Sequence, residues 1–178
     1  FAHLHGIAWA FVVFCVFGYL LIKSVLREIQ RRTELQRLYE KVDKLNKGLA
    51  PIIEEGLDLL VAEAFRNGQI SATTDSDYAI KNSDLSFICV GTPQKMDGSI
   101  NLEYIEKVCS EIGETLKDKE EYHTVVIRST VMPGTLEKAI NILENSSGKK
   151  EGKDFSALVN PEFMREGSAI KDFFNPPF

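Results

Sequence analysis

The chain has 178 residues, of which 44% are hydrophobic and 26% charged, a composition typical of globular proteins that excludes a disordered or fibrous one. Its net charge of −5 argues against a general nucleic-acid-binding protein, so we expect no nucleic-acid partner. The three cysteines form no C-x-x-C pair and provide no zinc-ligand spacing, so we expect no metal site. They favour a reducing compartment, and we expect a cytoplasmic protein.

The first 22 residues contain no Asp, Glu, Lys or Arg, whereas residues 23–48 carry eight basic and four acidic side chains. The run Ile7–Ile22 approaches the length of a membrane-spanning helix, and the basic residues after it suit a cytoplasmic flank. A buried strand of a soluble core, as the remnant of a first strand, is the alternative. We therefore interpret residues 1–22 as an apolar segment, and a membrane helix remains the lesser possibility.

Residues 23–48 are predicted to form an amphipathic helix, because apolar side chains recur there at steps of three and four. Gly48 is a plausible stop, and Pro51 prevents continuation. The chain starts with Phe1 instead of Met and ends with Phe178 after two prolines. We expect a fragment, or a reading frame without its true start.

From residue 49 onward, helical and strand patterns alternate. The expected helices are 56–67, 76–81 (capped by Asp75), 102–116 and 133–143, and the expected extended segments are 69–72, 85–90, 122–127 and 155–159. The segment 85–90 is apolar nearly throughout, which predicts a buried strand of a parallel sheet covered on both faces. Strands that alternate with helices make βαβ units, so the predicted fold class is α/β with a parallel sheet.

Three polar clusters follow the last three predicted strands. They are Gly91-Thr92-Pro93, Arg128-Ser129-Thr130 and Asn160-Pro161-Glu162. In a parallel sheet, ligands bind beyond the carboxyl ends of the strands, so the clusters predict one shared crevice. Taken singly, each cluster also fits a purely structural role: Thr92 and Thr130 as turn caps, and Glu162 as a helix cap or a partner of Arg165.

The clusters lie in stretches that resemble a known family. These stretches are KVDKLNKGLAPIIEEGL (41–57), ATTD (72–75), SDLSFICVGTP (83–93), DGSINLEYIEKV (97–108), HTVVIRSTVMPGT (123–135) and NPEFMREGSAIKDF (160–173). From Lys41 to Phe178 the chain resembles the N-terminal domain of the nucleotide-sugar 6-dehydrogenases. The stretch SGKKEGKDF (147–155) favours the GDP-mannose branch over the UDP-glucose branch.

The resemblance implies a Rossmann-like, doubly wound parallel sheet that is incomplete at its N-terminus, with residues 49–178 as a partial dinucleotide-binding domain. It also implies an enzyme that oxidises the C6 alcohol of a nucleotide sugar, GDP-mannose or UDP-glucose, to a carboxylate while two NAD are reduced. A second domain completes such enzymes, which are homo-oligomers.

The resemblance also assigns roles to individual residues. The NAD site is implied for Lys41, Thr92 and Thr130, and the sugar-nucleotide site for Phe163, Met164, Arg165 and Glu166. Glu162 and Thr130 are implied to be catalytic residues. Glu162 is implied to lie near the reacting carbon, where a carboxylate with a raised pKa can order or deprotonate the hydrolytic water.

Two features depart from the family pattern. No G-x-G-x-x-G turn is present to hold a pyrophosphate, and Gln36 occupies the expected place of the acid that binds ribose. The catalytic cysteine of the family belongs to the second domain, and we interpret Cys15, Cys89 and Cys109 as packing residues. We therefore expect this polypeptide to be inactive alone. A membrane-anchored, non-catalytic remnant and a nucleotide-binding module without chemistry are the alternatives.

Overall fold

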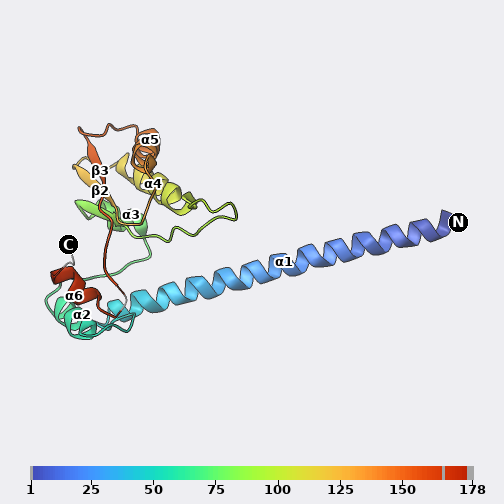
Figure 1. Cartoon of the computed structure of the whole chain (residues 1–178), viewed down its shortest axis with the longest axis horizontal. Helices are drawn as coiled ribbons and strands as arrows, with labels where there is room; N and C mark the ends of the chain where they lie inside the picture. The colour runs from blue at the N-terminus through green and yellow to red at the C-terminus, as the bar shows by residue number, and fades with distance from the viewer. Residues whose placement is uncertain (1, 166, 176–178) are drawn as a thin grey trace. The chain divides into compact units, whose positions relative to one another are not determined.

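The computed structural model describes residues 2–165 and 167–175, with the side chains of α1 described from residue 23 onward. The elements in chain order are α1 (Ala2–Leu45), α2 (Leu57–Arg66), α3 (Ser76–Lys81), β1 (Leu85–Ile88), α4 (Glu103–Leu116), β2 (His123–Ile127), α5 (Thr135–Ser147), β3 (Phe155–Val159) and α6 (Ala169–Phe174), labelled in Figure 1 where space permits. Two compact units result. One contains the chain up to Pro51 and Leu60–Thr74, and the other contains Ile52–Leu59 and the chain from Asp75 onward.

The first unit is dominated by α1, a single helix of 44 residues that continues through the region where a remnant first strand was an alternative. The helix ends before Gly48, as predicted, and this glycine has a φ of 71°. A side chain at this position would meet the ring of Phe65 at 2.9 Å, so the turn requires glycine.

The predicted extended piece 69–72 pairs with no strand. Instead, the amide group of Asn46 exchanges two hydrogen bonds of 2.8 Å with the backbone N–H and C=O of Ala72. The Asn46 side chain thus makes the hydrogen bonds to the Ala72 backbone that a neighbouring β-strand would otherwise make.

Among the residues whose side chains the structure describes, no helix is long and apolar enough to cross a membrane. The predicted apolar segment 1–22 lies outside the described side chains.

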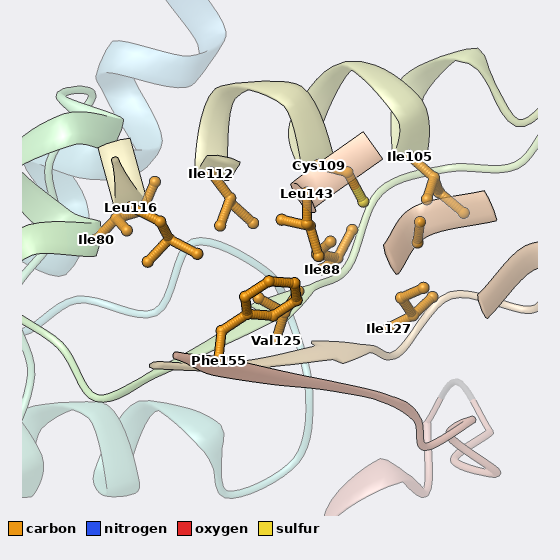
Figure 2. Close-up of a cluster of buried hydrophobic side chains, with 11 residues drawn as sticks. Ile80, Ile88, Ile105, Cys109, Ile112, Leu116, Val125, Ile127, Leu143 and Phe155 are labelled. Atoms are coloured by element: carbon orange, nitrogen blue, oxygen red, sulfur yellow. The ribbon is translucent and has the colours of Figure 1, made fainter. Parts of the chain in front are cut away.

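The second unit contains a parallel sheet in the order β1-β2-β3, which confirms the predicted α/β fold class. Helices α4 and α5 pack against one face of this sheet. Figure 2 shows Ile112 of α4 and Leu143 of α5 pointing toward Phe155 of β3. The buried core includes Ile80, Ile88, Ile105, Cys109, Ile112, Leu116, Val125, Ile127, Ala139, Leu143 and Phe155.

The opposite face of the sheet is only partly covered in the described part of the chain, because Val126 is buried there but its register partner Phe87 is not. The predicted burial of segment 85–90 is therefore wrong for most of its residues. Strand β1 ends at Ile88, and Phe87 is 57% exposed because alternate side chains of a strand point away from α4 and α5. Cys89 is also exposed, so its interpretation as a packing residue is wrong, whereas Cys109 is buried as predicted. Burial raises the pKa of the Cys109 thiol to about 11.

Helix α5 differs from its predicted bounds at both ends, and one helix was missed. Helix α5 begins at Thr135 and not at Pro133, because Gly134 before it has a φ of 85°. It then continues to Ser147, where Gly148 ends it in the left-handed conformation. Helix α6 was not predicted at all.

Helices α4 and α5 approach each other closely at Gly113. A Cβ atom at this position would lie 2.6 Å from Cβ of Ser146 and 3.2 Å from the carbonyl oxygen of Leu143. Neither atom is the mobile end of a side chain, so the glycine sets the distance between the two helices that cover the sheet.

A buried polar cluster lies at the amino end of β2, away from the predicted crevice. Lys119 Nζ donates to the carbonyl oxygens of Ile80, at 2.9 Å, and of Ser83. His123 is fully buried, with Nδ1 3.0 Å from the Ser83 oxygen and Nε2 2.9 Å from Ser86 Oγ. Because a carbonyl only accepts, Nδ1 carries the proton and Nε2 accepts from Ser86. This burial supports the structural role expected for His123.

Replacing Gly113 tests the helix contact. Although alanine favours helix by about 1 kcal/mol over glycine, we expect Gly113→Ala to lower the free energy of unfolding by about 1–3 kcal/mol, because α4 and α5 must separate. Urea unfolding followed by circular dichroism measures this. The exposed neighbour Glu114→Ala is the control, and equal or greater stability of Gly113→Ala would contradict the contact.

The second prediction concerns pH. Burial holds the pKa of His123 below its usual value of 6.5, and the positive charge of Lys119 lowers it further. The unfolded chain therefore binds more protons below pH 6.5, so the free energy of unfolding is expected to fall as the pH is lowered from about 7.5 to 5. Urea unfolding at each pH measures the slope. In His123→Gln the slope should flatten over this range, and an unchanged slope would assign it to other groups.

Candidate functional site

The three predicted polar clusters lie at one edge of the sheet. Because β1, β2 and β3 are parallel, their carboxyl ends share an edge, and Ile88, Ile127 and Val159 are aligned there in register. The loops that follow these residues are consequently neighbours in space. The convergence predicted from the sequence is therefore confirmed for the loops after the three strands.

Side chains tie the loop after β1 to the loop after β2. Thr92 Oγ1 donates to the carbonyl oxygen of Thr130 at 3.2 Å, and Ser129 Oγ donates to the carbonyl oxygen of Val90 at 2.6 Å. The backbone N–H groups of Arg128 and Ser129 both reach the carbonyl oxygen of Ile88. Thr92 and Thr130 thus belong to one hydrogen-bonded group of loop residues at the carboxyl edge of the sheet, which we call the rim.

The loop after β3 joins the same rim through Arg128. Its Nη1 donates to Asn160 Oδ1 at 2.8 Å and to the Asn160 carbonyl oxygen at 3.2 Å. The N–H of Asn160 in turn donates to the carbonyl oxygen of Ile127 at 3.0 Å. All three loops are therefore connected by bonds from side chains to backbone.

The exposure of the two threonines suits contact with a ligand. Thr92 is half-buried with its hydroxyl proton directed to Thr130, so the lone pairs of Oγ1 remain able to accept a hydrogen bond. Thr130 is exposed. A ribose hydroxyl or a water molecule is the kind of donor that Thr92 can bind.

Glu162 is exposed, and its Oε2 accepts a hydrogen bond of 2.7 Å from the backbone N–H of Met164. This bond closes a local turn. The two structural roles expected for Glu162, a helix cap and a pair with Arg165, are both wrong, because residues 161–165 form no helix and Arg165 pairs with Asp172.

The loop that contains Phe163, Met164 and Arg165 is held by Asp172, a residue that the sequence motifs did not single out. Arg165 donates to the two Asp172 oxygens through Nη2 at 2.7 Å and Nε at 3.0 Å, and Ser168 Oγ donates to Oδ2 at 2.9 Å. These bonds hold the pKa of the buried Asp172 carboxyl well below its usual value. The four-residue step from Ser168 to Asp172 was the available signal.

Phe163 and Met164 are exposed on this loop, whereas the predicted Glu166 lies outside the described residues. Lys41 is exposed on α1 and belongs to the first unit, so its predicted role at the NAD site stays a prediction.

The described residues fit a dinucleotide in part. The rim offers hydroxyl and backbone groups suited to a ribose, and no atom lies within 4 Å of the position of a Cβ at Gly91. A pyrophosphate, however, needs several closely spaced glycines at a helix N-terminus, and the sequence contains no G-x-G-x-x-G turn. The described rim is therefore suited to a ribose, whereas the sequence offers no such cradle for a pyrophosphate.

Comparison with known proteins agrees with this geometry. GDP-mannose 6-dehydrogenase of Pseudomonas putida is 54% identical over 138 residues, which is 77% of this chain and 32% of that protein. UDP-glucose 6-dehydrogenase of Haloferax volcanii is 43% identical over 136 residues, which is 76% of this chain and 31% of that protein. The chain thus spans about a third of the length of these relatives.

The fold of the chain is also similar to that of a solved GDP-mannose dehydrogenase structure. A ternary complex of GDP-mannose dehydrogenase from Pseudomonas aeruginosa has a TM-score of 0.75 and 51% identity, over 78% of this chain and 32% of that chain. This agreement confirms the Rossmann-like fold expected from the motifs. The NAD binding domain of the UDP-glucose/GDP-mannose dehydrogenase family matches residues 37–178. By this match, the chain belongs to the UDP-glucose/GDP-mannose dehydrogenase family and contains its NAD-binding domain.

Proposed function

We propose that this chain forms part of an enzyme that oxidises GDP-mannose at C6 to GDP-mannuronate, with UDP-glucose as the second choice of substrate. The observation that carries the proposal is the rim in which Thr92 and Thr130 are joined at the carboxyl edge of a parallel sheet. The greater identity to a GDP-mannose enzyme than to a UDP-glucose enzyme supports the choice of sugar.

In this proposal NAD supplies a hydride acceptor, and the residues of the chain orient it. Thr92 accepts a hydrogen bond from a ribose hydroxyl because its own proton is directed to Thr130. Ser129 keeps the rim in place through its bond to the carbonyl oxygen of Val90.

The sugar nucleotide is assigned to the loop after β3. Phe163, Met164 and Arg165 contribute their backbone, because the Arg165 guanidinium is already occupied by Asp172. Glu162, next to them, orders or deprotonates the hydrolytic water. A base of this kind needs a raised pKa, so the exposed carboxylate must become buried by the substrate or by further polypeptide.

The full reaction needs groups that the 178 residues do not supply. Glycines must cradle the pyrophosphate, and a reactive thiolate must form the covalent intermediates with the sugar. The buried Cys109, whose thiol has a pKa of about 11, is unsuited to that task. Cys89 is exposed but lies in no nucleophile motif, and the resemblance places the catalytic cysteine in the second domain. We therefore propose that this polypeptide is inactive alone and acts only as part of a larger enzyme.

Turnover tests this proposal in two steps. The 178-residue chain, mixed with NAD and either GDP-mannose or UDP-glucose, should form no NADH, and calorimetry should detect no NAD binding. A chimera in which residues 41–178 replace the matching segment of the Pseudomonas putida enzyme should form NADH with GDP-mannose. In this chimera, Thr92→Val should raise the KM for NAD about tenfold, because a hydrogen bond to a ribose is lost.

The matched control is Thr92→Ser, which retains the hydroxyl and should stay close to the unmodified chimera. Thr130→Val leaves the Thr130 carbonyl, and so the rim, intact. Equal KM values for Thr92→Val and Thr92→Ser would remove Thr92 from the cofactor site. NADH formation by the 178-residue chain alone would overturn the proposed dependence on further polypeptide.

One observation favours a second candidate, a membrane-anchored, non-catalytic remnant of the domain. Residues 2–22 belong to a continuous helix and include no Asp, Glu, Lys or Arg. At 1.5 Å per residue this part of the helix is roughly 30 Å long, which matches the hydrocarbon core of a bilayer.

Carbonate extraction of membranes from cells that express the chain tests this candidate. An anchored protein stays in the pellet, and a variant that starts at Lys23 should move to the supernatant because it has lost the uncharged segment. Release of the complete chain by carbonate would exclude the anchor.

A further inference from the structure

Glu54, which precedes α2, is bound to a loop more than a hundred residues away in the sequence. Its Oε2 accepts the N–H of Gly167 at 3.0 Å, and its Oε1 accepts the N–H of Ala169 at 2.9 Å. All three residues belong to the same compact unit. One carboxylate thus holds two backbone N–H groups, one with each oxygen.

These N–H groups lie at the start of α6, where a helix offers no acceptors of its own. Ser168 is the N-cap residue, but its side chain donates to Asp172 and caps nothing. Gly167 has a φ of 77°, a conformation that other residues rarely adopt. Glu54 therefore takes over the capping that a local side chain would otherwise provide.

The loop is consequently held at two points. Asp172 binds Arg165 through its guanidinium and its backbone N–H, the latter at 3.1 Å. Glu54 binds the backbone at Gly167 and Ala169. Beside the first of these points are Phe163 and Met164, which the proposed function assigns with Arg165 to the sugar nucleotide.

Glu54 acts here through hydrogen bonds and contributes little through packing. It is half-buried and lines an open hollow of about 280 Å³ that also contains Lys171 and Phe174. Shortening the side chain would enlarge a space already open to water, so the loss of the carboxylate can be tested without creating a dry cavity.

We propose that Glu54 is a positioning residue, which fixes the backbone at Gly167 and Ala169 and so helps to hold the described residues 163–165 in the conformation that meets the sugar nucleotide. The ligand part of this inference rests on the proposed function. The carboxylate contacts the loop backbone and not the substrate, so its effect on binding passes through the position of the loop.

Three variants of the complete chain test the proposal: Glu54→Ala, Glu54→Gln and, as a matched control, Glu55→Ala at the exposed neighbouring acid. Amide hydrogen exchange is measured by NMR at Gly167 and Ala169, with Leu143 in the core as a reference for global unfolding. Glu54→Ala should speed exchange at both amides at least tenfold and leave Leu143 unchanged. Glu54→Gln retains one acceptor oxygen, so it should deprotect one amide far more than the other.

The ligand arm is an NMR titration with GDP-mannose at millimolar concentration. We expect the backbone signals of Met164 and Arg165 to shift in the wild-type chain and in Glu55→Ala, and the affinity to fall at least fivefold in Glu54→Ala. Unchanged exchange at Gly167 and Ala169, or equal affinity of wild type and Glu54→Ala, would overturn the role of Glu54. A third outcome concerns the proposed function. If Glu54→Ala speeds exchange at Gly167 and Ala169 as expected, but the wild-type signals of Met164 and Arg165 do not shift with GDP-mannose, the assignment of this loop to GDP-mannose is overturned.

Discussion

The parallel register of three strands is the constraint on which the described site depends. Because β1, β2 and β3 end level with one another, the loops after Ile88, Ile127 and Val159 emerge at one edge. Short side-chain bonds to backbone then join these loops, with Thr92 bound to Thr130 and Arg128 bound to Asn160. An antiparallel neighbour would place one of these loops at the other end of the sheet, and the rim would be lost.

The two ends of the sheet serve different purposes. At the amino end, buried Lys119 and His123 bind backbone carbonyl groups, so this end contributes to stability. At the carboxyl end, polar groups such as Thr130 and Glu162 remain exposed and are available to a ligand. This division follows the general rule that open parallel sheets bind ligands beyond the carboxyl ends of their strands.

Much of the fold could be predicted from local patterns. Helix α3 with its Asp75 cap, and strand β3 with its bounds, follow from side chains only a few residues apart. The burial of strand β1 could not be predicted, because a run of apolar residues indicates affinity for a core but not whether a second layer covers it. Phe87 and Cys89, which the apolar run predicted to be buried, are exposed.

The candidate site also has a part that the sequence predicted and a part that it did not. The three loops were found because each follows a strand and contains a recognisable motif. Asp172 and Glu54 were missed because their importance lies in partners that the sequence does not mark: Arg165 seven residues away for the first, and the N–H groups of Gly167 and Ala169 for the second. Hydrogen bonds to backbone leave little trace in residue type.

The pairing of Arg165 with Asp172 has a consequence for the electrical character of the loop. An unpaired guanidinium would present a mobile positive charge to any anion nearby. Here a carboxylate with a depressed pKa neutralises the guanidinium at neutral pH, so the Arg165 side chain offers no free positive charge to a ligand. Attraction by dipoles decays faster with distance than attraction by charge, so the proposed contact of this loop with a sugar nucleotide would gain little from the Arg165 charge and would depend on shape at short range.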